Sequence, residues 1–371
     1  MLKVLHTSDL HLSAGEDRDY ALAVLREIVS LANSKQADFL LVCGDLFDAF
    51  KDIKDSALLN SALGELRLLR KDCRALYIPG NHENLGRGSK EKLSNFDLGR
   101  LELAADCGCG FGGGVVTVPD AEFICVPYAA DYSGYRNWKL PAKTQGRARL
   151  LLMHGTSSAV YRGPDQEEQQ GGIIPDSLLA WVEADYAALG HVHSRGETLI
   201  ASTLAAYCGS ARVWRRGESG PRKAVFFETE GGKIGPRQEL PLRAAGEYRH
   251  FTLPLNPDCS IAPAAMRELL EKYPAPLRDY IAVSFSGLVE DANALPEVKK
   301  VIEDVLRAKN PRRLEIFSDQ VETYGGFAEN GLAKEFLDKL DSCRPAEGAA
   351  DMPLWLAARR QGLAALAGEL E

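Results

Sequence analysis

Short apolar runs alternate with segments of helical periodicity over the first two thirds of the chain. The runs predict strands at Lys3–His6, Phe39–Cys43, Ala75–Ile78, Phe123–Val126, Leu150–Met153 and Ala187–Leu189. Between the first two runs, Tyr20–Asn33 carries apolar residues at helical spacing, and a second helix is predicted over Ser56–Lys71. Strands that alternate with helices in this way predict a layered α/β or α+β domain.

The pattern starts again after Pro241–Glu247, whose Pro-Leu-Arg-Ala-Ala-Gly-Glu sequence is typical of a joint between domains. It predicts a β-α-β-α-β run with strands at His250–Leu255, Tyr280–Phe285 and Arg313–Phe317 and helices at Pro263–Lys272 and Glu297–Ala308. Such a run forms a small domain of its own. We therefore expect a first domain over residues 1–240 and a second over 246–320.

Residues 324–371 form the last predicted part, a helical segment whose final helix begins near Pro353. One face of this helix collects Leu356, Leu363, Leu366 and Leu370. Two interpretations stay open, because such a face docks a partner protein or packs on its own domain. Trp355, which follows a proline-containing loop, favours an anchored segment.

Length and composition describe a folded chain with an acidic balance. The 371 residues exceed one ordinary domain, and hydrophobic and charged residues make up 45% and 26% of them, which are ordinary globular values. The formal net charge of -8 argues against a protein that coats nucleic acid. A local basic face stays open, because Arg195–Arg249 holds ten Lys and Arg against six Asp and Glu, or 10 − 6 = +4. A solvated surface explains that stretch equally well.

The eight cysteines are scattered and show no disulfide framework. Cys107 and Cys109 lack a second pair at zinc-finger spacing, which disfavours a zinc site there. The glycine-rich patch Gly108–Gly114 precedes a predicted strand and indicates a turn, because a phosphate loop joins a strand to a helix. The chain opens directly into a motif and holds no long uncharged apolar stretch, so we expect a soluble, cytoplasmic protein.

Five of the seven histidines lie in short polar segments that directly follow apolar runs. The segments are Ser8-Asp9-Leu10-His11, Gly80-Asn81-His82-Glu83, His154-Gly155 and Gly190-His191-Val192-His193, joined by the carboxylate segment Gly44-Asp45-Leu46-Phe47-Asp48. A strand that ends in a loop delivers its next residues to the carboxyl edge of the sheet, where open α/β sheets place their sites. The segments are therefore expected to converge, and the glycines before Asp45, Asn81 and His191 allow tight turns.

The donor types in these segments predict a metal centre. Aspartate, asparagine and histidine suit Mn, Fe or Zn at five or six ligands, and the lack of cysteine ligands fits a catalytic site. Seven candidate ligands exceed what one ion with an open position needs, so two ions that share a bridging carboxylate fit better. Two ions roughly 3.5–4 Å apart activate water and neutralise charge on a phosphoryl oxygen, which is hydrolysis of a phosphate ester.

The ordered set of segments resembles the calcineurin-like metallophosphoesterase superfamily over roughly the first two hundred residues. The resemblance implies a two-sheet sandwich flanked by helices, followed by a small α/β capping domain and terminal helices. It also implies that one ion is held by Asp9, His11 and His193, the other by Asn81, His154 and His191, with Asp45 as the bridge. We expect two divalent ions, with Mn2+ as the first choice and Fe, Zn or Mg as alternatives.

Two further residues are expected to take catalytic roles. By the resemblance His82 faces the scissile phosphate, where an imidazole beside two cations stabilises the transition state or protonates the leaving oxygen. The alternative for His82 is support of Asn81. Asp48 stands where some relatives carry a histidine implicated in exonuclease action, and its alternatives are helix capping and support of the ligands.

Finer features are similar to the SbcD-like DNA repair nucleases. They are the opening His-Thr-Ser-Asp-Leu-His-Leu, the Gly-Asp-Leu-Phe-Asp segment, the residues Tyr186–His193 and the Tyr-Cys-Gly-Ser at Tyr207–Ser210. In that family a capping domain helps to contact DNA, and terminal helices bind an SbcC-type coiled-coil ATPase. The resemblance implies a metal-dependent exonuclease in double-strand-break repair that is associated with the nucleoid when on DNA. Endonuclease action and a homodimer stay open.

The sequence departs from this family near Asp48 and at Glu83. Ala-Phe-Lys-Asp-Ile-Lys follows Asp48 in place of a Pro-Ser-containing loop, and Glu83 replaces the usual Asp after the Asn-His pair. With these departures the chain resembles a divergent, YhaO-type branch that is paired with its own ATPase. The alternatives are a small-molecule phosphodiesterase of the same superfamily and a non-catalytic scaffold, which the intact ligand set disfavours.

Overall fold

The computed structural model describes residues 1–83, 92–105, 114–160, 172–256, 258–272, 278–289, 291–323, 331–346 and 349–368. The chain forms two compact units, Met1–Glu247 and Tyr248–Glu371.

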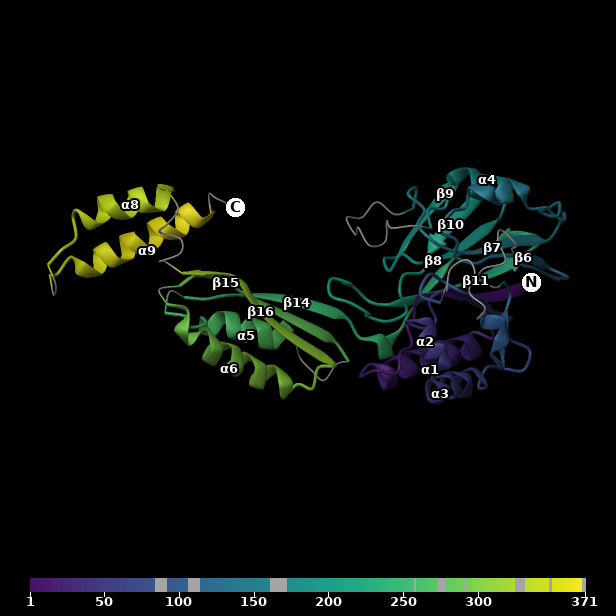
Figure 1. Ribbon diagram of the computed structural model, residues 1–371, viewed down its shortest axis with the longest axis horizontal. Coiled ribbons are helices and arrows are strands. Elements are labelled where there is room, and N and C mark those ends of the chain that lie inside the picture. Colours follow the sequence, from purple (N-terminus) through teal and green to yellow (C-terminus); the bar gives the residue numbers. More distant parts are fainter. Residues whose placement is uncertain are drawn as a thin grey trace. The chain divides into compact units, whose positions relative to one another are not determined.

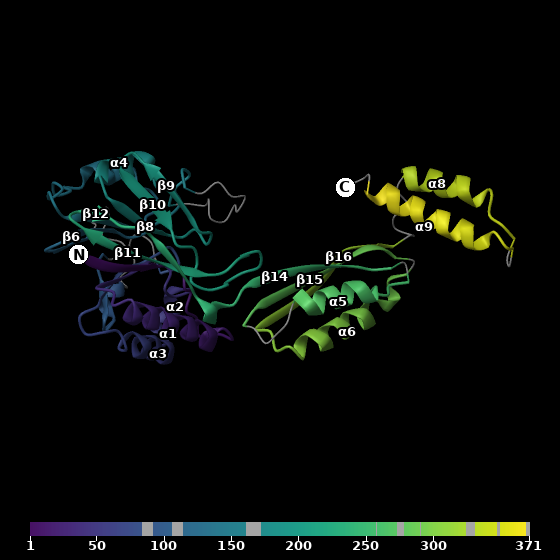
Figure 2. The same cartoon turned by 180° about the vertical axis from the view of Figure 1, so that it is seen from behind.

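The first unit contains two mixed β-sheets (Figure 1, Figure 2). The first sheet has the order β12-β11-β1-β2-β3-β4, and β13 also pairs with β11. Its strands are β1 (Leu2–Thr7), β2 (Phe39–Cys43), β3 (Arg74–Ile78), β4 (Leu101–Leu103), β11 (Lys223–Glu230), β12 (Lys233–Ile234) and β13 (Gln238–Pro241). The second sheet has the order β5-β6-β7-β8-β10-β9. Its strands are β5 (Gly114–Val118), β6 (Ala121–Val126), β7 (Ala148–His154), β8 (Tyr186–Gly190), β9 (Gly196–Ile200) and β10 (Thr203–Tyr207).

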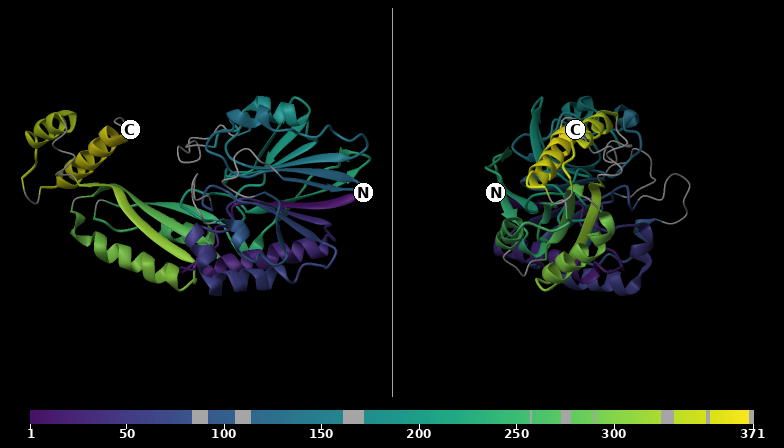
Figure 3. Two further views of the ribbon diagram at one scale, coloured as in Figure 1. Left: turned by 45° about the vertical axis from the view of Figure 1, so that its right-hand side comes forward. Right: turned by 90° about the vertical axis from the view of Figure 1, so that its left-hand side faces the viewer.

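The two sheets pack face to face, and helices cover their outer faces (Figure 3). Helices α1 (Arg18–Ser34), α2 (Phe50–Lys54) and α3 (Ser56–Leu66) cover the first sheet, and α4 (Asp176–Val182) covers the second. Every residue of β2 is buried, because helices cover one face of the sheet and the second sheet covers the other. A strand in this position needs an unbroken apolar run, which β2 has. The predicted two-sheet sandwich flanked by helices is confirmed.

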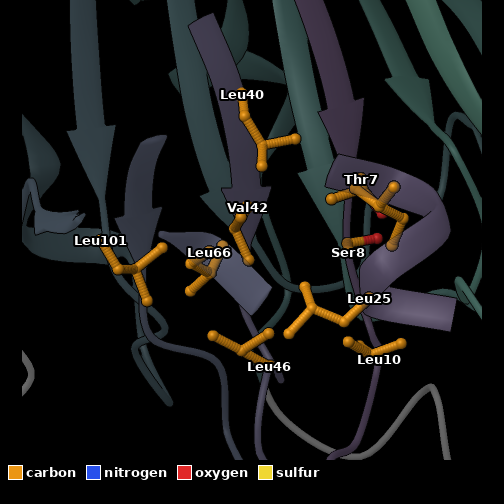
Figure 4. A pocket seen from close by; sticks show the side chains of 10 residues that line it. Thr7, Ser8, Leu10, Leu25, Leu40, Val42, Leu46, Leu66 and Leu101 are labelled. Atoms are coloured by element: carbon orange, nitrogen blue, oxygen red, sulfur yellow. The ribbon is translucent and has the colours of Figure 1, made fainter. Parts of the chain in front are cut away.

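The core beneath the loops that follow β1 and β2 is closely packed (Figure 4). A cavity of about 10 Å³ lies there, and its lining includes Leu25 of α1, Leu40 and Val42 of β2 and Leu66 of α3. Such a volume holds one water molecule at most, and apart from Thr7 and Ser8 the lining is apolar and offers that water few partners. This gap is a packing defect and no ligand site, so the two loops rest on a firm apolar floor.

The second unit contains a three-stranded parallel sheet with the order β14-β15-β16. The strands are β14 (Tyr248–Pro254), β15 (Tyr280–Val289) and β16 (Arg313–Thr323), and the helices between them are α5 (Pro263–Lys272) and α6 (Leu295–Arg307). Both helices cover the same face of the sheet (Figure 2), where Leu269 and Leu306 pack with Phe285. Parallel neighbours need such crossover connections, and the predicted β-α-β-α-β run supplies them.

Two helices, α8 (Gly331–Asp341) and α9 (Met352–Gly368), come last in the described chain. Leu363 of α9 is buried with Leu337 of α8, and the indole N–H of Trp355 donates to the carbonyl of Leu340 at 3.0 Å. Leu356, by contrast, is 46% exposed. The predicted apolar face is therefore divided between packing and solvent, and Leu370 lies outside the described residues. Within the described part of the chain, no helix is long and apolar enough to cross a membrane.

Several elements escaped the sequence patterns, among them α4 and the strands from β9 to β13. The edge strand β9 exposes alternate residues and is only five residues long, so its apolar pattern is weak. Helix α3 ends at Leu66 and not at Lys71, because the chain tightens there: the N–H groups of Leu68 and Leu69 donate to carbonyls three residues back. Cys107, Cys109 and residues 108–113 of the glycine-rich patch lie outside the described residues, and Gly114 begins β5.

Candidate metal centre

Loops from both sheets of the first unit meet where β1, β2, β3, β7 and β8 end. The N–H of Asp9 donates to the carbonyl of Gly44 at 3.1 Å, and the N–H of His11 donates to the carbonyl of Asp45 at 2.9 Å. The N–H of His191 donates to both carboxylate oxygens of Asp9, at 3.0 and 3.1 Å. The structure thus brings the loops after β1, β2 and β8 into direct hydrogen-bond contact.

The backbone of these loops is strained. Asp9, His11, Asp45 and His191 have φ angles of 53°, 48°, 49° and 97°, in a region that residues other than glycine rarely adopt. At Gly190 a Cβ atom would lie 1.8 Å from the carbonyl oxygen of Cys43, so no side chain fits there. Strain of this kind persists where the surrounding structure imposes it, and it gathers at functional sites.

The first ligand cluster consists of Asp9, His11 and His193, which offer donor atoms within 4.8 Å of one another. Nε2 of His193 lies 3.1 Å from Nε2 of His11 and 3.9 Å from Oδ1 of Asp9. All three side chains are buried. Two imidazole nitrogens and a carboxylate that face one another from separate loops suit a divalent cation.

The second ligand cluster consists of Asp45, His154 and His191, again with donor atoms within 4.8 Å. Asn81 joins it, because its Oδ1 lies 3.0 Å from Nε2 of His154 and 2.9 Å from Nδ1 of His191. Nδ1 of His154 donates to the carbonyl of Cys43 at 2.8 Å, and Nε2 lies 3.2 Å from Oδ2 of Asp45. A backbone bond to one ring nitrogen is how metal-binding histidines are commonly oriented.

Burial and neighbouring charges shift the pKa values of the ligands in different directions. Burial lowers the pKa of His11 to about 4, so this imidazole is neutral at pH 7. Burial also acts to lower the pKa of His154, but the carboxylates of Asp45 and Asp9 outweigh it and raise that pKa to about 9. For Asp45, burial favours a higher pKa, yet His154 and other imidazoles hold it below its usual range. The buried carboxylates therefore draw positive charge to the centre.

The donor set fits a pair of divalent cations. Each cluster offers two imidazole nitrogens together with carboxylate or amide oxygens, and no thiolate takes part. Such mixed oxygen and nitrogen ligands suit Mn, Fe or Zn. A metal ion would displace the proton of His154, because ligands bind in their deprotonated form.

His82 and Asp48 lie beside the first ligand cluster. The backbone N–H of His82 donates to Oδ1 of Asp45 at 3.0 Å, and the ring Nδ1 of His82 donates to the carbonyl of Asp48 at 2.6 Å. Oδ1 of Asp48 lies 3.4 Å from Nδ1 of His11. Helix α2 begins after Ala49 without a side-chain cap, so Asp48 does not cap it and instead faces His11.

A cavity of about 200 Å³ adjoins the two ligand clusters. Its lining is made of Asp45, Asn81, His82, His191, His193, Trp214 and Arg215. The cavity thus connects metal-ligand candidates with His82, and it is large enough for a phosphoryl group to reach them.

Glu83 fastens the loops after β2 and β3 to each other. Its buried carboxylate accepts the N–H groups of Asp45, Phe47 and Gly80 at 3.0, 2.8 and 2.8 Å. Burial, followed by the charge of Asp45, raises the pKa of Glu83 to about 7. The sequence identified Glu83 only as a departure from its relatives, whereas the structure shows that it supports Asp45.

Trp214 and Glu218 are further residues that sequence reasoning missed. Trp214 stacks on His11 with ring centroids 4.1 Å apart and an interplanar angle of 9°. Glu218 contacts Nδ1 of His193 and accepts the N–H of Trp214 at 2.7 Å. Burial acts to raise the pKa of Glu218, but His193 outweighs it and the pKa falls to about 2. Both histidines of the first ligand cluster are therefore positioned by this segment.

Several arginines of the basic stretch Arg195–Arg249 contact carboxylates or carbonyls of the first unit. Arg212 donates to the carbonyls of Leu10 and His11, both at 2.7 Å, and thereby holds the loop after β1. Arg195 and Arg237 both pair with Glu197. These three arginines are held by groups of the first unit. The positive charge of the stretch therefore does not by itself indicate an exposed basic face.

The chain is similar to several known proteins. The family model of calcineurin-like phosphoesterases matches residues 2–195. The DNA double-strand break repair protein Mre11 of Aeropyrum pernix is 28% identical over 232 residues, which cover 56% of this chain and 53% of that protein. The uncharacterized metallophosphoesterase YhaO of Bacillus subtilis is 23% identical over 263 residues, which cover 63% of this chain and 59% of that protein. The predicted resemblance is confirmed at this level.

A shorter match links the chain to the SbcD component of the nuclease SbcCD from Staphylococcus saprophyticus, with 27% identity over 139 residues and 34% of each chain covered. The chain spans about half the length of Mre11 and YhaO. Among solved structures, a dimetal phosphatase from Danio rerio aligns at 12% identity with a TM-score of 0.40, covering 65% of this chain and 99% of that one.

Replacing Glu83 tests its support of Asp45. Glu83→Ala leaves three buried N–H groups without their acceptor, so we expect the free energy of unfolding to fall by at least about 2 kcal/mol. Glu83→Gln keeps the shape and one carbonyl oxygen, so its free energy of unfolding should fall less. Denaturant unfolding of the metal-free protein, followed by tryptophan fluorescence, measures both. A loss below about 0.5 kcal/mol for Glu83→Ala, equal to that of the exposed control Glu102→Ala, would contradict this role.

Replacing Glu218 tests the orientation of His193. Glu218→Gln keeps the size of the side chain but removes the charge beside Nδ1, and we expect Mn2+ affinity to drop by about 10- to 100-fold. Calorimetric titration of metal-free protein with Mn2+ measures this, and Glu102→Gln, which alters only an exposed ion pair with Arg74, is the matched control. Equal Mn2+ affinity in wild type and Glu218→Gln would show that Glu218 does not act on the centre.

Proposed function

Because the chain belongs to the calcineurin-like phosphoesterase family, we propose that it hydrolyses phosphodiester bonds in DNA as the nuclease component of a repair complex. The observation that carries this proposal is the meeting of two buried ligand clusters beside His82 and a cavity. The similarity to Mre11 of Aeropyrum pernix and to the SbcD component of the nuclease SbcCD supports DNA as the substrate.

The metal ligands of this proposal are the residues of the two clusters. Asp9, His11 and His193 would hold one ion and Asn81, His154 and His191 would hold the other, and Asp45 would contribute to both. Two divalent ions, with Mn2+ as the first choice, would activate water for attack and neutralise charge on the phosphoryl oxygens. Glu83 and Glu218 keep Asp45 and His193 in place.

His82 is the proposed general acid or transition-state stabiliser. Its Nδ1 is committed to the carbonyl of Asp48, so Nε2 is the atom that holds or delivers a proton. His82 lines the cavity. Its backbone N–H donates to the carboxylate of Asp45, which fixes this residue beside the proposed bridging ligand. Asp48 takes part by orienting His82 through its carbonyl and His11 through its carboxylate.

The second unit and the terminal helices take the remaining proposed roles. We assign DNA contact to the β14-β15-β16 sheet with its helices. We assign docking of an SbcC-type coiled-coil ATPase to the α8 and α9 helices. Support for docking comes from the exposed apolar side chains of these helices, since Leu332, Leu354 and Leu356 are 58%, 74% and 46% exposed.

A small-molecule phosphodiesterase is the second candidate, and two observations favour it. The cavity of about 200 Å³ is small, and Arg195, Arg212 and Arg237 are engaged by carboxylates or carbonyls of the first unit. A small ester needs only the metal centre and this cavity, whereas DNA needs phosphate contacts over a longer surface.

Manganese-dependent cleavage of a linear, end-labelled duplex tests the proposal, with bis-p-nitrophenyl phosphate hydrolysis run in parallel. We expect wild-type protein to shorten the duplex and His82→Ala and Asp45→Ala to lower the rate by at least about 100-fold. Asp72→Ala removes an exposed carboxylate paired with Arg70 and should retain the wild-type rate.

Turnover of the small ester while the duplex stays intact, even with an ATPase partner added, would reject DNA as the substrate in favour of a small phosphodiester. Hydrolysis of neither substrate by the Mn2+-loaded protein would reject the phosphoesterase activity itself.

A further inference from the structure

Arg215 belongs to the wall of the cavity that adjoins the metal centre. The cavity of about 200 Å³ is lined by residues of the two ligand clusters, by His82 and Trp214, and by this arginine. Among the described residues of that lining, Arg215 is the one lysine or arginine. A permanent cation therefore stands beside the place where a phosphoryl group would meet the metal ligands.

The guanidinium of Arg215 is held by the same residues that position the first ligand cluster. Its Cζ lies 5.5 Å from the centroid of the Trp214 ring, and Trp214 is itself stacked on His11. Its Nε lies 3.7 Å from Oε1 of Glu218, the carboxylate that contacts His193. Trp214 thus links Arg215 to His11, and Glu218 links it to His193.

The environment of Arg215 differs from that of neighbouring arginines. Arg212 is 1% exposed and Arg222 is 7% exposed, and both donate to backbone carbonyls of the site loops. The side chain of Arg215 is 27% exposed and forms an ion pair with Glu218 at 3.7 Å. Arg212 and Arg222 hold the loops together, whereas Arg215 belongs to the lining of the cavity and is partly exposed.

We propose that Arg215 is a phosphate-binding residue, whose guanidinium donates to nonbridging oxygens of the phosphoryl group at the metal centre. A planar guanidinium matches two phosphate oxygens at once, which a point charge does not. It also stabilises charge that builds up on those oxygens during hydrolysis. This inference rests on the proposed phosphoesterase function but not on DNA as the substrate.

Inorganic phosphate is the probe that tests the inference apart from turnover. Calorimetric titration of the Mn2+-loaded protein with phosphate should show binding weakened about 10- to 100-fold in Arg215→Gln. Metal content, measured by mass spectrometry, should equal that of wild type. Arg216→Gln removes the same charge from the adjacent exposed residue and should leave phosphate affinity unchanged. The kcat/KM for bis-p-nitrophenyl phosphate should fall in parallel with the phosphate affinity.

Wild-type phosphate affinity in Arg215→Gln with full metal content would overturn the inference. Loss of bound metal in that variant would also overturn it, because Arg215 would then serve the ligands and not the phosphate. If Arg215→Gln does not fold, Arg215→Lys keeps the charge but loses the planar fork. It should bind phosphate more weakly than wild type, and equal binding would contradict the proposal. A protein that binds phosphate through Arg215 but leaves DNA intact would refute only the DNA part of the proposed function.

Discussion

Two buried carboxylates that approach one imidazole are the constraint on which the site depends. Oδ1 of Asp9 lies 4.0 Å from Nδ1 of His154, and Oδ2 of Asp45 lies 3.2 Å from Nε2 of the same ring. Burying such charges is costly unless positive charge compensates them, and protonated His154 or a bound cation meets that need here. The positive φ angles of Asp9 and Asp45 show that the backbone is bent to hold this arrangement.

The supports around the site all act on these two carboxylates and their histidine neighbours. Glu83 accepts the backbone N–H groups of Asp45 and Phe47, and Arg212 donates to the carbonyls of Leu10 and His11, which follow Asp9. Trp214 and Glu218 fix His11 and His193 from outside the five strand ends. The closely packed floor beneath the β1 and β2 loops resists their collapse into the core. A rigid frame of this kind keeps ligands in place when their charges change.

The sequence predicted the parts of the molecule that depend on local pattern. Strand β2 is an unbroken apolar run and β1 and β3 are largely apolar, so the polar segments that follow Thr7, Cys43 and Ile78 could be placed at one sheet edge. Trp214 and Glu218 could not be found this way, because they lie in an irregular segment that has no helical or strand periodicity. They contact His11 and His193, which follow β1 and β8, only in the folded chain. The charge count over Arg195–Arg249 left a basic face and a solvated surface equally open, since such a count does not show which cations meet carbonyls inside the fold.

Anomalous diffraction from crystals of the protein grown with Mn2+ tests the two-metal centre most directly. We expect two peaks roughly 3.5–4 Å apart. One should lie among Asp9, His11 and His193 and the other among Asn81, His154 and His191, with the carboxylate of Asp45 between the peaks. A single peak, or peaks away from Asp45, would contradict a two-metal centre bridged by this carboxylate.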